Sequence, residues 1–291
     1  MQVLLQQVRR ALLTILLGGF LGATLLRFSP GWGLDERELD PHLSSESRQA
    51  ARAEYESERN VLIYYAHYLK AALSLDLGIS RSFNRPVTGL LRERLPETTR
   101  SLAFGVTVGL LAGLVLAIAN AYAGWRLLDL AASALAGLSL SIPAGLIALG
   151  CFWLRAPVSW AIALAVFPHI YRYAGNILGK AYGTGHVFAA RAGGQSEPRI
   201  LAAHVLWPAT PELFALAAVA VSVAFGAAVP IEVICDAPGI GQMAWKAALA
   251  RDLPLLTGVT LLITVMTVTA TSVADLALSF ARTSERRRGR P

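Results

Sequence analysis

Long apolar runs constrain this chain more than any other feature of its 291-residue sequence. One run covers residues 11–28, and five more lie downstream, at residues 101–122, 127–153, 160–178, 212–234 and 253–280. A helix of about 20 apolar residues crosses the hydrocarbon core of a bilayer. Since 55% of the residues are hydrophobic and only 15% are charged, we predict an all-α, polytopic membrane protein with about six transmembrane helices.

The basic residues lie mainly at the ends of the apolar runs. The formal net charge is +7, and arginines precede the first run at Arg9 and Arg10 and fill the tail after residue 281. Basic flanks mark the cytoplasmic side of membrane proteins. An even number of spans also puts both termini on one side, so we expect both in the cytoplasm. The clustered charge therefore indicates topology, and no nucleic-acid partner is expected.

The polar and apolar stretches divide the chain into four parts. Residues 1–28 form a first transmembrane helix, which we expect to be retained rather than cleaved as a signal peptide, because the run is long and further spans follow. Residues 29–100 form an extracytoplasmic segment, and residues 101–281 form a transmembrane core with a cytoplasmic loop at 182–208. Residues 282–291 form a basic cytoplasmic tail.

Two amphipathic helices are expected in the extracytoplasmic segment. The second begins near Pro86, which suits a first turn, and Pro96 should end it. The first is indicated by apolar side chains at helical spacing, namely Leu62, Tyr65, Leu69 and Ala72. We expect both helices to pack on the outer surface.

The cytoplasmic loop is charged and yet helix-forming. Gly193 and Gly194 break the helical pattern, which resumes at Ser196, a good N-cap with Pro198 in the first turn. We therefore predict two short helices joined by a glycine hinge, with Pro208 ending the second. One face of that second helix carries Ile200, Ala203, His204 and Trp207. Such an element lies along the membrane surface, and a plain connector between spans is the alternative interpretation.

A gradient-driven secondary transporter is the rival class, and it should carry ionisable groups at mid-membrane. His169 and Arg172 are its best candidates, although packing near a helix end also accounts for both. The second span offers only Asn120, near its end. Four acidic residues lie nearer helix ends, where snorkelling or interfacial placement explains them; these are Asp129, Glu212, Glu232 and Asp275. No filter sequence of a channel occurs.

Motifs for nucleotide or metal chemistry are weak. The stretch GNILGKA, residues 175–181, is too short for a phosphate-binding loop, and Ala181 stands where Ser or Thr would hold magnesium. We therefore expect no ATP site in this chain. Cys151 and Cys235 read as small buried hydrophobes, with a disulfide left open if both reach the outer side. No Cys/His cluster has metal-ligand spacing, so no metal site is expected.

The loop sequence ARAGGQSEPRILAAHVLWPA resembles the cytoplasmic loop of binding-protein-dependent ABC importer permeases, in particular the oligopeptide, dipeptide and nickel branch. Phe188 stands where the general motif has Glu. Three further stretches resemble family landmarks in order: LDLGISRSFNRPVTGLLRERLPETTRSLAF, LSIPAG and PIEVICDAPGIGQMAWKAALARDLPLL. The matching loop positions are Ala190, Arg191, Ala192, Gly194, His204, Leu206 and Pro208.

The resemblance implies a type I ABC importer permease fold in the inner membrane of a bacterium, and a set of partners. These would be a second homologous permease subunit, two cytoplasmic ATPase subunits that bind ATP and magnesium, and an extracytoplasmic substrate-binding protein. This chain itself would hold no cofactor and would carry peptides, nickel chelates or related solutes. The loop would be the coupling helix on the ATPase, with contacts from Ala189, Ala190, Arg191, Ala192, Gly194, Glu197, Arg199, His204 and Pro208. An outer loop near the binding protein would use Glu232, Pro238, Gly239 and Gly241.

Overall fold

The computed structural model describes residues 61–74, 76–124 and 126–288, together with short pieces before residue 25. Much of the predicted first transmembrane helix and of the extracytoplasmic segment lies outside these residues. Among the described residues the regular elements are helices, and strand pairing is limited to one isolated bridge between Ile79 and Pro86.

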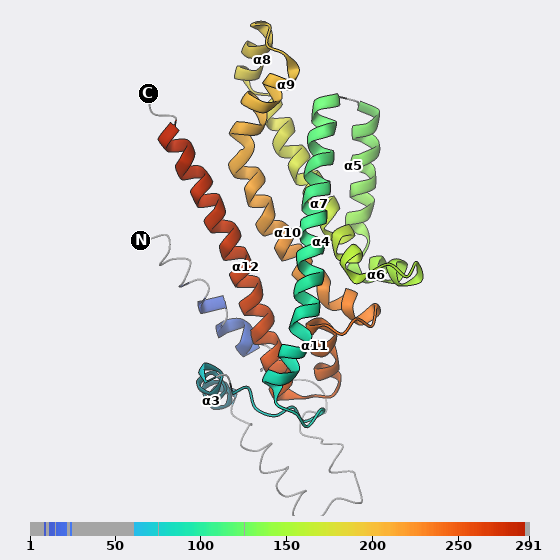
Figure 1. Ribbon diagram of the computed structural model, residues 1–291, viewed down its shortest axis with the longest axis vertical. Coiled ribbons are helices and arrows are strands. Elements are labelled where there is room, and N and C mark those ends of the chain that lie inside the picture. Colours follow the sequence, from blue (N-terminus) through green and yellow to red (C-terminus); the bar gives the residue numbers. More distant parts are fainter. Residues whose placement is uncertain are drawn as a thin grey trace, which may run out of the picture. The chain divides into compact units, whose positions relative to one another are not determined.

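The helices follow one another in the order drawn in Figure 1. Their bounds are α3 Val61–Leu73, α4 Val87–Ala123, α5 Arg126–Ser141, α6 Ala144–Trp153, α7 Val158–Tyr182, α8 Gly185–Ala192, α9 Glu197–Ile200, the π-helix η2 Leu201–Leu206, α10 Trp207–Ile234, α11 Ile240–Leu249 and α12 Leu253–Arg288. The chain forms two compact units, residues 1–96 with 243–266 and residues 97–242 with 267–291.

Three of the described helices are long and apolar enough to cross a membrane, namely Val87–Ala123, Glu197–Ile234 and Leu253–Val273. A fourth span results if the bent pair Leu130–Ser141 and Ala144–Trp153 counts as one. The helices bear out the predicted all-α class, while the number of six spans stays a prediction.

The run at residues 127–153 was expected to form one span, and it forms two helices that meet at an angle of 100°. Pro143 causes the break, because its ring disfavours helical geometry at the preceding Ile142 and it has no amide hydrogen to donate. The chain turns at this point, and α6 restarts with a hydrogen bond from the Leu146 amide to the Pro143 carbonyl, 2.9 Å long.

Pro96 does not end a helix, contrary to the prediction. It lies inside α4, which continues for 37 residues from Val87 to Ala123. Proline removes the hydrogen bond to the carbonyl four residues earlier, here that of Arg92. Both Pro96 and Arg92 are exposed, so the freed carbonyl lies on an open side of the helix and the interruption is tolerated.

In the second unit, α7 packs against α5, α6 and α10. The close approach of α4 to α7 depends on a column of glycines, Gly105, Gly109 and Gly113, spaced one helical turn apart. All three are buried, and the side chains of Ile162, Val166 and Ile170 on α7 occupy the space above them. Small residues let two transmembrane backbones approach closely.

We expect Gly109→Ala to destabilise the protein by about 1–3 kcal/mol, because overpacking forces the two helices apart. A Cβ at this position would lie 2.8 Å from the Val166 Cβ and 2.9 Å from the Ala163 carbonyl oxygen. The matched control is Gly226→Ala on α10, where a Cβ meets no atom within 4 Å. Thermal unfolding in detergent should show a loss for the first variant alone, and equal behaviour of the two would refute the packing role.

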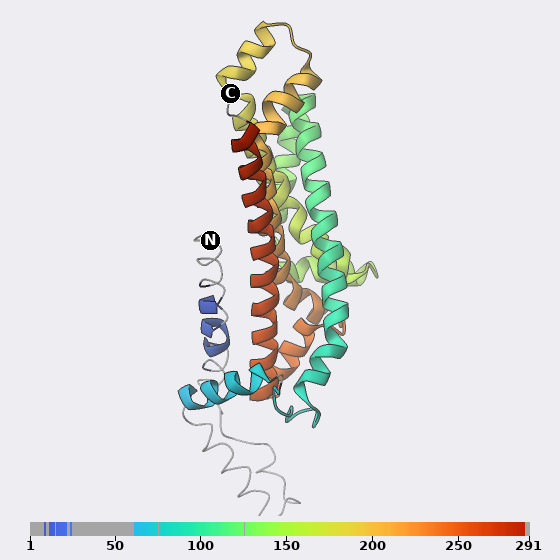
Figure 2. The same cartoon turned by 60° about the vertical axis from the view of Figure 1, so that its left-hand side comes forward.

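In the first unit, a buried carboxylate joins the start of α12 to the segment before α4. Asp252 is fully buried; its Oδ2 accepts hydrogen bonds from Ser80 Oγ at 2.5 Å, Ser82 Oγ at 2.7 Å and the Ser82 amide at 2.9 Å. Its Oδ1 caps α12 by accepting from the Leu255 amide at 3.1 Å. Figure 2 shows α3 lying crosswise to the first turns of α12.

The packed face of α3 contains three of the four predicted residues, Tyr65, Leu69 and Ala72, but not Leu62. Tyr65 and Tyr68 are buried, whereas Leu62 is 68% exposed. The Tyr68 hydroxyl lies 3.5 Å from the Pro254 carbonyl at the start of α12. A tyrosine can bury its ring and still donate from its tip, so the aromatic pair, rather than Leu62, sets which side of the helix packs.

Acid should weaken the Asp252 cluster. Burial tends to raise the pKa of Asp252, but the hydrogen bonds from Ser80, Ser82 and Leu255 outweigh it and hold the pKa below its ordinary value. A carboxyl with a lowered folded pKa stabilises the fold above its unfolded pKa, and this contribution disappears as pH falls through the folded value. At pH 7 Asp252→Asn should therefore unfold at a lower temperature than wild type. The two unfolding temperatures should converge as the pH falls from about 4 through the lower folded pKa. An equal difference at both pH values would contradict this.

Candidate functional site

The loop between α7 and α10 contains a sharp turn at its two glycines, as predicted. Gly194 has φ of +75°, in the left-handed region that glycine tolerates. The Gln195 amide donates to the Ala190 carbonyl at 3.2 Å and the Gly194 amide to the Arg191 carbonyl at 3.1 Å, which is the Schellman pattern of a helix end. The turn therefore ends α8 in a fixed geometry and directs the chain into α9.

An ion pair closes the turn from outside. The Arg191 guanidinium holds the Glu197 carboxylate with two bonds, Nε to Oε1 at 2.7 Å and a terminal nitrogen to Oε2 at 3.1 Å. Both side chains are about half exposed. Arg191 was predicted to contact a partner at the rim of an interface; in this structure it also joins α8 to α9.

Two histidines add further bonds between the helices of the loop. His204 Nε2 lies 3.0 Å from Gln195 Oε1, and His186 Nε2 lies 3.1 Å from the His204 carbonyl oxygen. His204 was among the predicted site residues, whereas His186 and Gln195 were missed. The roles of His186 and Gln195 depend on the geometry of the turn, because their bonds to His204 span 18 and 9 residues of the chain. No local sequence pattern indicates these contacts.

Pro208 does not end the second helix, which corrects the prediction. The helix runs on from α9 through η2 into α10, so that residues Glu197–Ile234 form one element. A proline at 208 cannot bond the carbonyl of residue 204. That carbonyl accepts instead from the His186 ring, and the wider π turn before Pro208 accommodates the proline ring.

The loop has a buried inner side and an exposed tip. Val187, Ala190, Ile200 and Val205 are buried and join the core of the second unit. Residues 191–199 are all exposed, which includes the predicted contacts Arg191, Ala192, Gly194, Glu197 and Arg199. Ala189 is exposed as well, and the neighbouring Phe188 is 63% exposed. We call residues 188–199 the loop tip.

A second candidate site lies at the opposite end of α10, where Glu232 is only 1% exposed. Its Oε1 accepts from Thr98 Oγ1 at 2.7 Å, and its Oε2 accepts from the amides of Gly241 at 2.6 Å and Gln242 at 3.4 Å. Thr98 Oγ1 in turn accepts from the Ile240 amide at 2.7 Å. Interpreting Glu232 as a snorkelling side chain was therefore wrong, because backbone amides and a hydroxyl satisfy the carboxylate inside the protein.

The predicted outer-loop residues meet at this carboxylate. A Cβ at Gly239 would overlap the Glu232 carboxyl group, and a Cβ at Gly241 would lie 2.7 Å from the Val229 Cα. Pro238 directly precedes Gly239 in the chain and is exposed. Glycine is required at both positions because the turn packs directly on α10. We call Thr98, Glu232 and residues 239–242 the Glu232 latch.

The ionisable groups that were considered for a gradient-driven transporter do not gather at one site in the described residues. His169 Nδ1 lies 3.0 Å from the Ala165 carbonyl of its own helix, and Arg172 lines a cavity. Glu212 is exposed, while the side chains of Asp129 and Asp275 lie outside the described ones.

The two cysteines form no disulfide. Cys151 and Cys235 are free thiols, with Cys235 Sγ 3.6 Å from the Ala148 carbonyl.

Most of the chain is similar in sequence to known proteins. Residues 105–282 match the family described as "Binding-protein-dependent transport system inner membrane component". A peptide transport system permease protein of Brucella suis is 26% identical over 314 residues, which cover 96% of this chain and 97% of that protein. A nickel import system permease protein of Staphylococcus aureus is 26% identical over 269 residues, covering 87% and 82% of the two chains.

A solved structure shares the fold. A chain of the inward-facing MetNI methionine ABC transporter superposes with a TM-score of 0.54 at 20% sequence identity, covering 66% of this chain and 94% of that one. The matched residues 105–282 include the loop tip and, apart from Thr98, the Glu232 latch.

Proposed function

Because this chain belongs to the family of binding-protein-dependent transport system inner membrane components, we propose that it is the permease subunit of an ATP-driven importer, forming the pathway for peptides or a related small solute such as a nickel chelate. Support for this cargo comes from relatives named as peptide and nickel permeases that align with most of the chain. ATP hydrolysis then takes place in separate subunits, and this chain is not itself an enzyme.

Coupling to the ATPase is assigned to the loop tip. The single observation that carries this assignment is the rigid, exposed turn at residues 191–199, fixed by the left-handed Gly194 and the Arg191–Glu197 pair. A moving ATPase subunit can pass its displacement on only through an element that keeps its shape. The turn is held by bonds between α8 and α9, and it can therefore transmit displacement to α7 and α10. Phe188, 63% exposed, offers an apolar side chain beside it, of the kind found at the centre of interfaces.

The proposed assembly has a second homologous permease subunit, two cytoplasmic ATPase subunits and an extracytoplasmic substrate-binding protein. The loop tip and both chain termini face the cytoplasm, and the Glu232 latch faces the outer side near the binding protein. Six spans cross the lipid bilayer in this arrangement. The basic residues at both ends of the chain support it.

Affinity purification of the tagged chain from its native membranes tests the assembly. We expect mass spectrometry to recover an ATPase subunit with a phosphate-binding loop, and the purified complex to hydrolyse ATP. The rival proposal is a gradient-driven secondary transporter. It gains support if the chain purifies without an ATPase and takes up solute in response to an ion gradient alone.

A further inference from the structure

The second unit contains a cavity of about 560 Å³ between α4, α5 and α7. Ligand pockets in proteins commonly measure about 300–1,000 Å³, so the space suits a small solute. From the proposed orientation, the lining residues lie in the cytoplasmic halves of α4 and α7. Neither the loop tip nor the Glu232 latch contributes to it.

Glycines keep the cavity open. Gly175 and Gly179 lie one turn apart on α7, and Gly137 faces them from α5; at all three positions a Cβ would meet no atom within 4 Å. This differs from the column at Gly105 and Gly109, where the neighbouring helix fills the space. The glycines of the cavity therefore leave room for something other than protein side chains of this unit.

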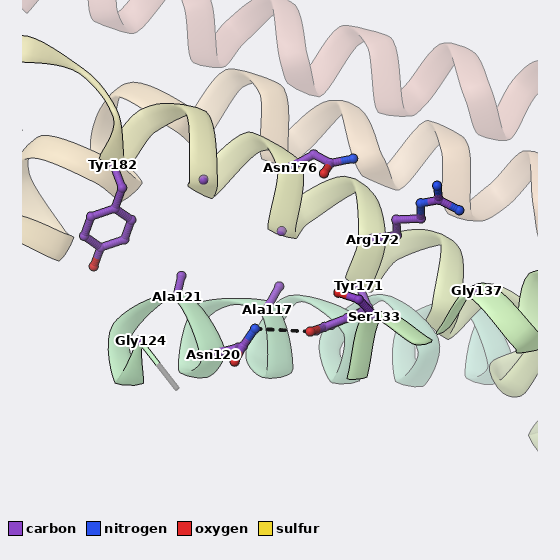
Figure 3. Close-up of a pocket in the computed structure, with 12 residues that line it drawn as sticks. Ala117, Asn120, Ala121, Gly124, Ser133, Gly137, Tyr171, Arg172, Asn176 and Tyr182 are labelled. Atoms are coloured by element: carbon purple, nitrogen blue, oxygen red, sulfur yellow. Dashed lines mark hydrogen bonds between the residues drawn. The ribbon is translucent and has the colours of Figure 1, made fainter. Parts of the chain in front are cut away.

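The polar lining is rich in hydrogen-bond donors. Arg172 and Asn176 leave α7 on the same side, one turn apart, and Asn120 on α4 donates to the Tyr171 hydroxyl at 3.2 Å (Figure 3). The Tyr182 hydroxyl is buried and has no hydrogen-bond partner among the described residues. Arg172 carries the only formal charge among the described residues that line the cavity.

In the arrangement proposed above, α7 is one of the six spans, and Arg172 is exposed on it. A charged side chain within a membrane span is costly and usually faces an aqueous space or an anion. A guanidinium binds a carboxylate with two parallel hydrogen bonds. The amide of Asn176, one turn along α7 on the same side as Arg172, can add a further donor (Figure 3). The arrangement is thus suited to an elongated, polar molecule with one anionic end.

We propose that this cavity is a binding site for the carboxylate of a solute in transit, with Arg172 as the carboxylate-binding residue and the glycines of α5 and α7 giving the rest of the solute its space. The proposal rests on the importer function proposed above and narrows its cargo to carboxylate-bearing solutes. It also gives the permease its own affinity for the solute, separate from that of the binding protein.

The test uses the assembled transporter in nanodiscs of phosphatidylcholine, without binding protein, and two probes, trialanine and trialanine amide. Wild type should bind trialanine saturably and the amide on the order of tenfold to a hundredfold more weakly, because a charge-assisted hydrogen bond is lost. Arg172→Gln should lose this discrimination, and Arg172→Lys should retain part of it. Gly175→Leu should abolish binding of both probes by filling the cavity.

Matched controls separate the cavity from general effects. Lys180→Gln removes a cation of the same helix that does not line the cavity, and Gly150→Leu adds the same bulk at an open position on α6. Both should bind trialanine as wild type does. Equal binding of the two probes by wild type, or wild-type binding by Arg172→Gln, would overturn the proposal. So would competition by phosphatidylglycerol in the nanodisc, which would assign the site to a lipid phosphate.

The importer function is measured separately in the same preparations, as ATP hydrolysis and as import of solute delivered by the binding protein. If the complex hydrolyses ATP and imports solute delivered by its binding protein while the cavity fails these tests, the carboxylate site is wrong and the importer stands. If no ATPase accompanies the chain, the proposed function itself has failed.

Discussion

Gly194→Trp abolishes ATP-driven uptake while the chain still inserts into the membrane. This is the expected result because Gly194 lies at the tip of an exposed turn and has a φ of +75°. A bulky L-residue is strained in that conformation and would project from the surface proposed to seat in the ATPase. We expect recovery of the ATPase with the tagged chain to fall by about tenfold or more, which corresponds to about 1.4 kcal/mol of binding free energy.

The control for this variant is Gly194→Asn. Asparagine adopts the left-handed region more readily than other side chains and adds little bulk, so it should keep most of the uptake. Immunoblots of membrane fractions check that both variants insert equally. Normal uptake by Gly194→Trp would remove the loop tip from the coupling interface, whereas loss of uptake in both variants would point to backbone geometry in place of the contact surface.

The second large effect is expected at the Glu232 latch. Glu232→Ala leaves two backbone amides and the Thr98 hydroxyl without their acceptor, and we expect it to cost about 3 kcal/mol of stability. Gly239→Ala should also destabilise, by about 1–3 kcal/mol, because the added Cβ overlaps the Glu232 carboxyl group. Thermal unfolding of the purified protein measures both.

The two changes should not be additive. The three atoms nearest to a Cβ at Gly239 all belong to the Glu232 side chain. Adding Gly239→Ala to Glu232→Ala should therefore cost almost nothing, with a coupling energy of about 1–3 kcal/mol. Gly241→Ala is the matched control, because its nearest clash is with the Val229 backbone at 2.7 Å and should persist in the same background. If the losses of stability of Gly239→Ala and Glu232→Ala were additive, the proposed contact between the two residues in the Glu232 latch would be contradicted.

The helical class of the fold and the glycine turn of the loop could be predicted from the sequence, because both depend on local signals. Apolar runs of spanning length determine the helices, and Gly193 and Gly194 determine the turn. Ser196 takes the expected position before α9, although its side chain makes no capping hydrogen bond. The effect of each proline on its helix was harder to predict. Pro143 breaks its helix, whereas Pro96 and Pro208 lie within continuous ones; whether a freed carbonyl finds solvent or a side chain depends on tertiary surroundings that the sequence does not display.

The pairing of distant polar groups could not be predicted for the same reason. Glu232 has its partner Thr98 at a separation of 134 residues, and Asp252 has Ser80 at 172. The pattern around Glu232 is equally consistent with an interfacial side chain, and only the fold of the following turn buries it. The cavity at Arg172 depends on three helices and on glycines whose open surroundings no periodicity distinguishes from the packed column at Gly109.

Uptake by proteoliposomes that contain the permease, its ATPase and its binding protein tests the central claim most directly. With ATP enclosed on the ATPase side and all ion gradients collapsed by ionophores, we predict that labelled peptide or nickel chelate accumulates, and that a non-hydrolysable ATP analogue prevents it. Accumulation by the permease alone, driven by an ion gradient and unaffected by ATP, would contradict the account.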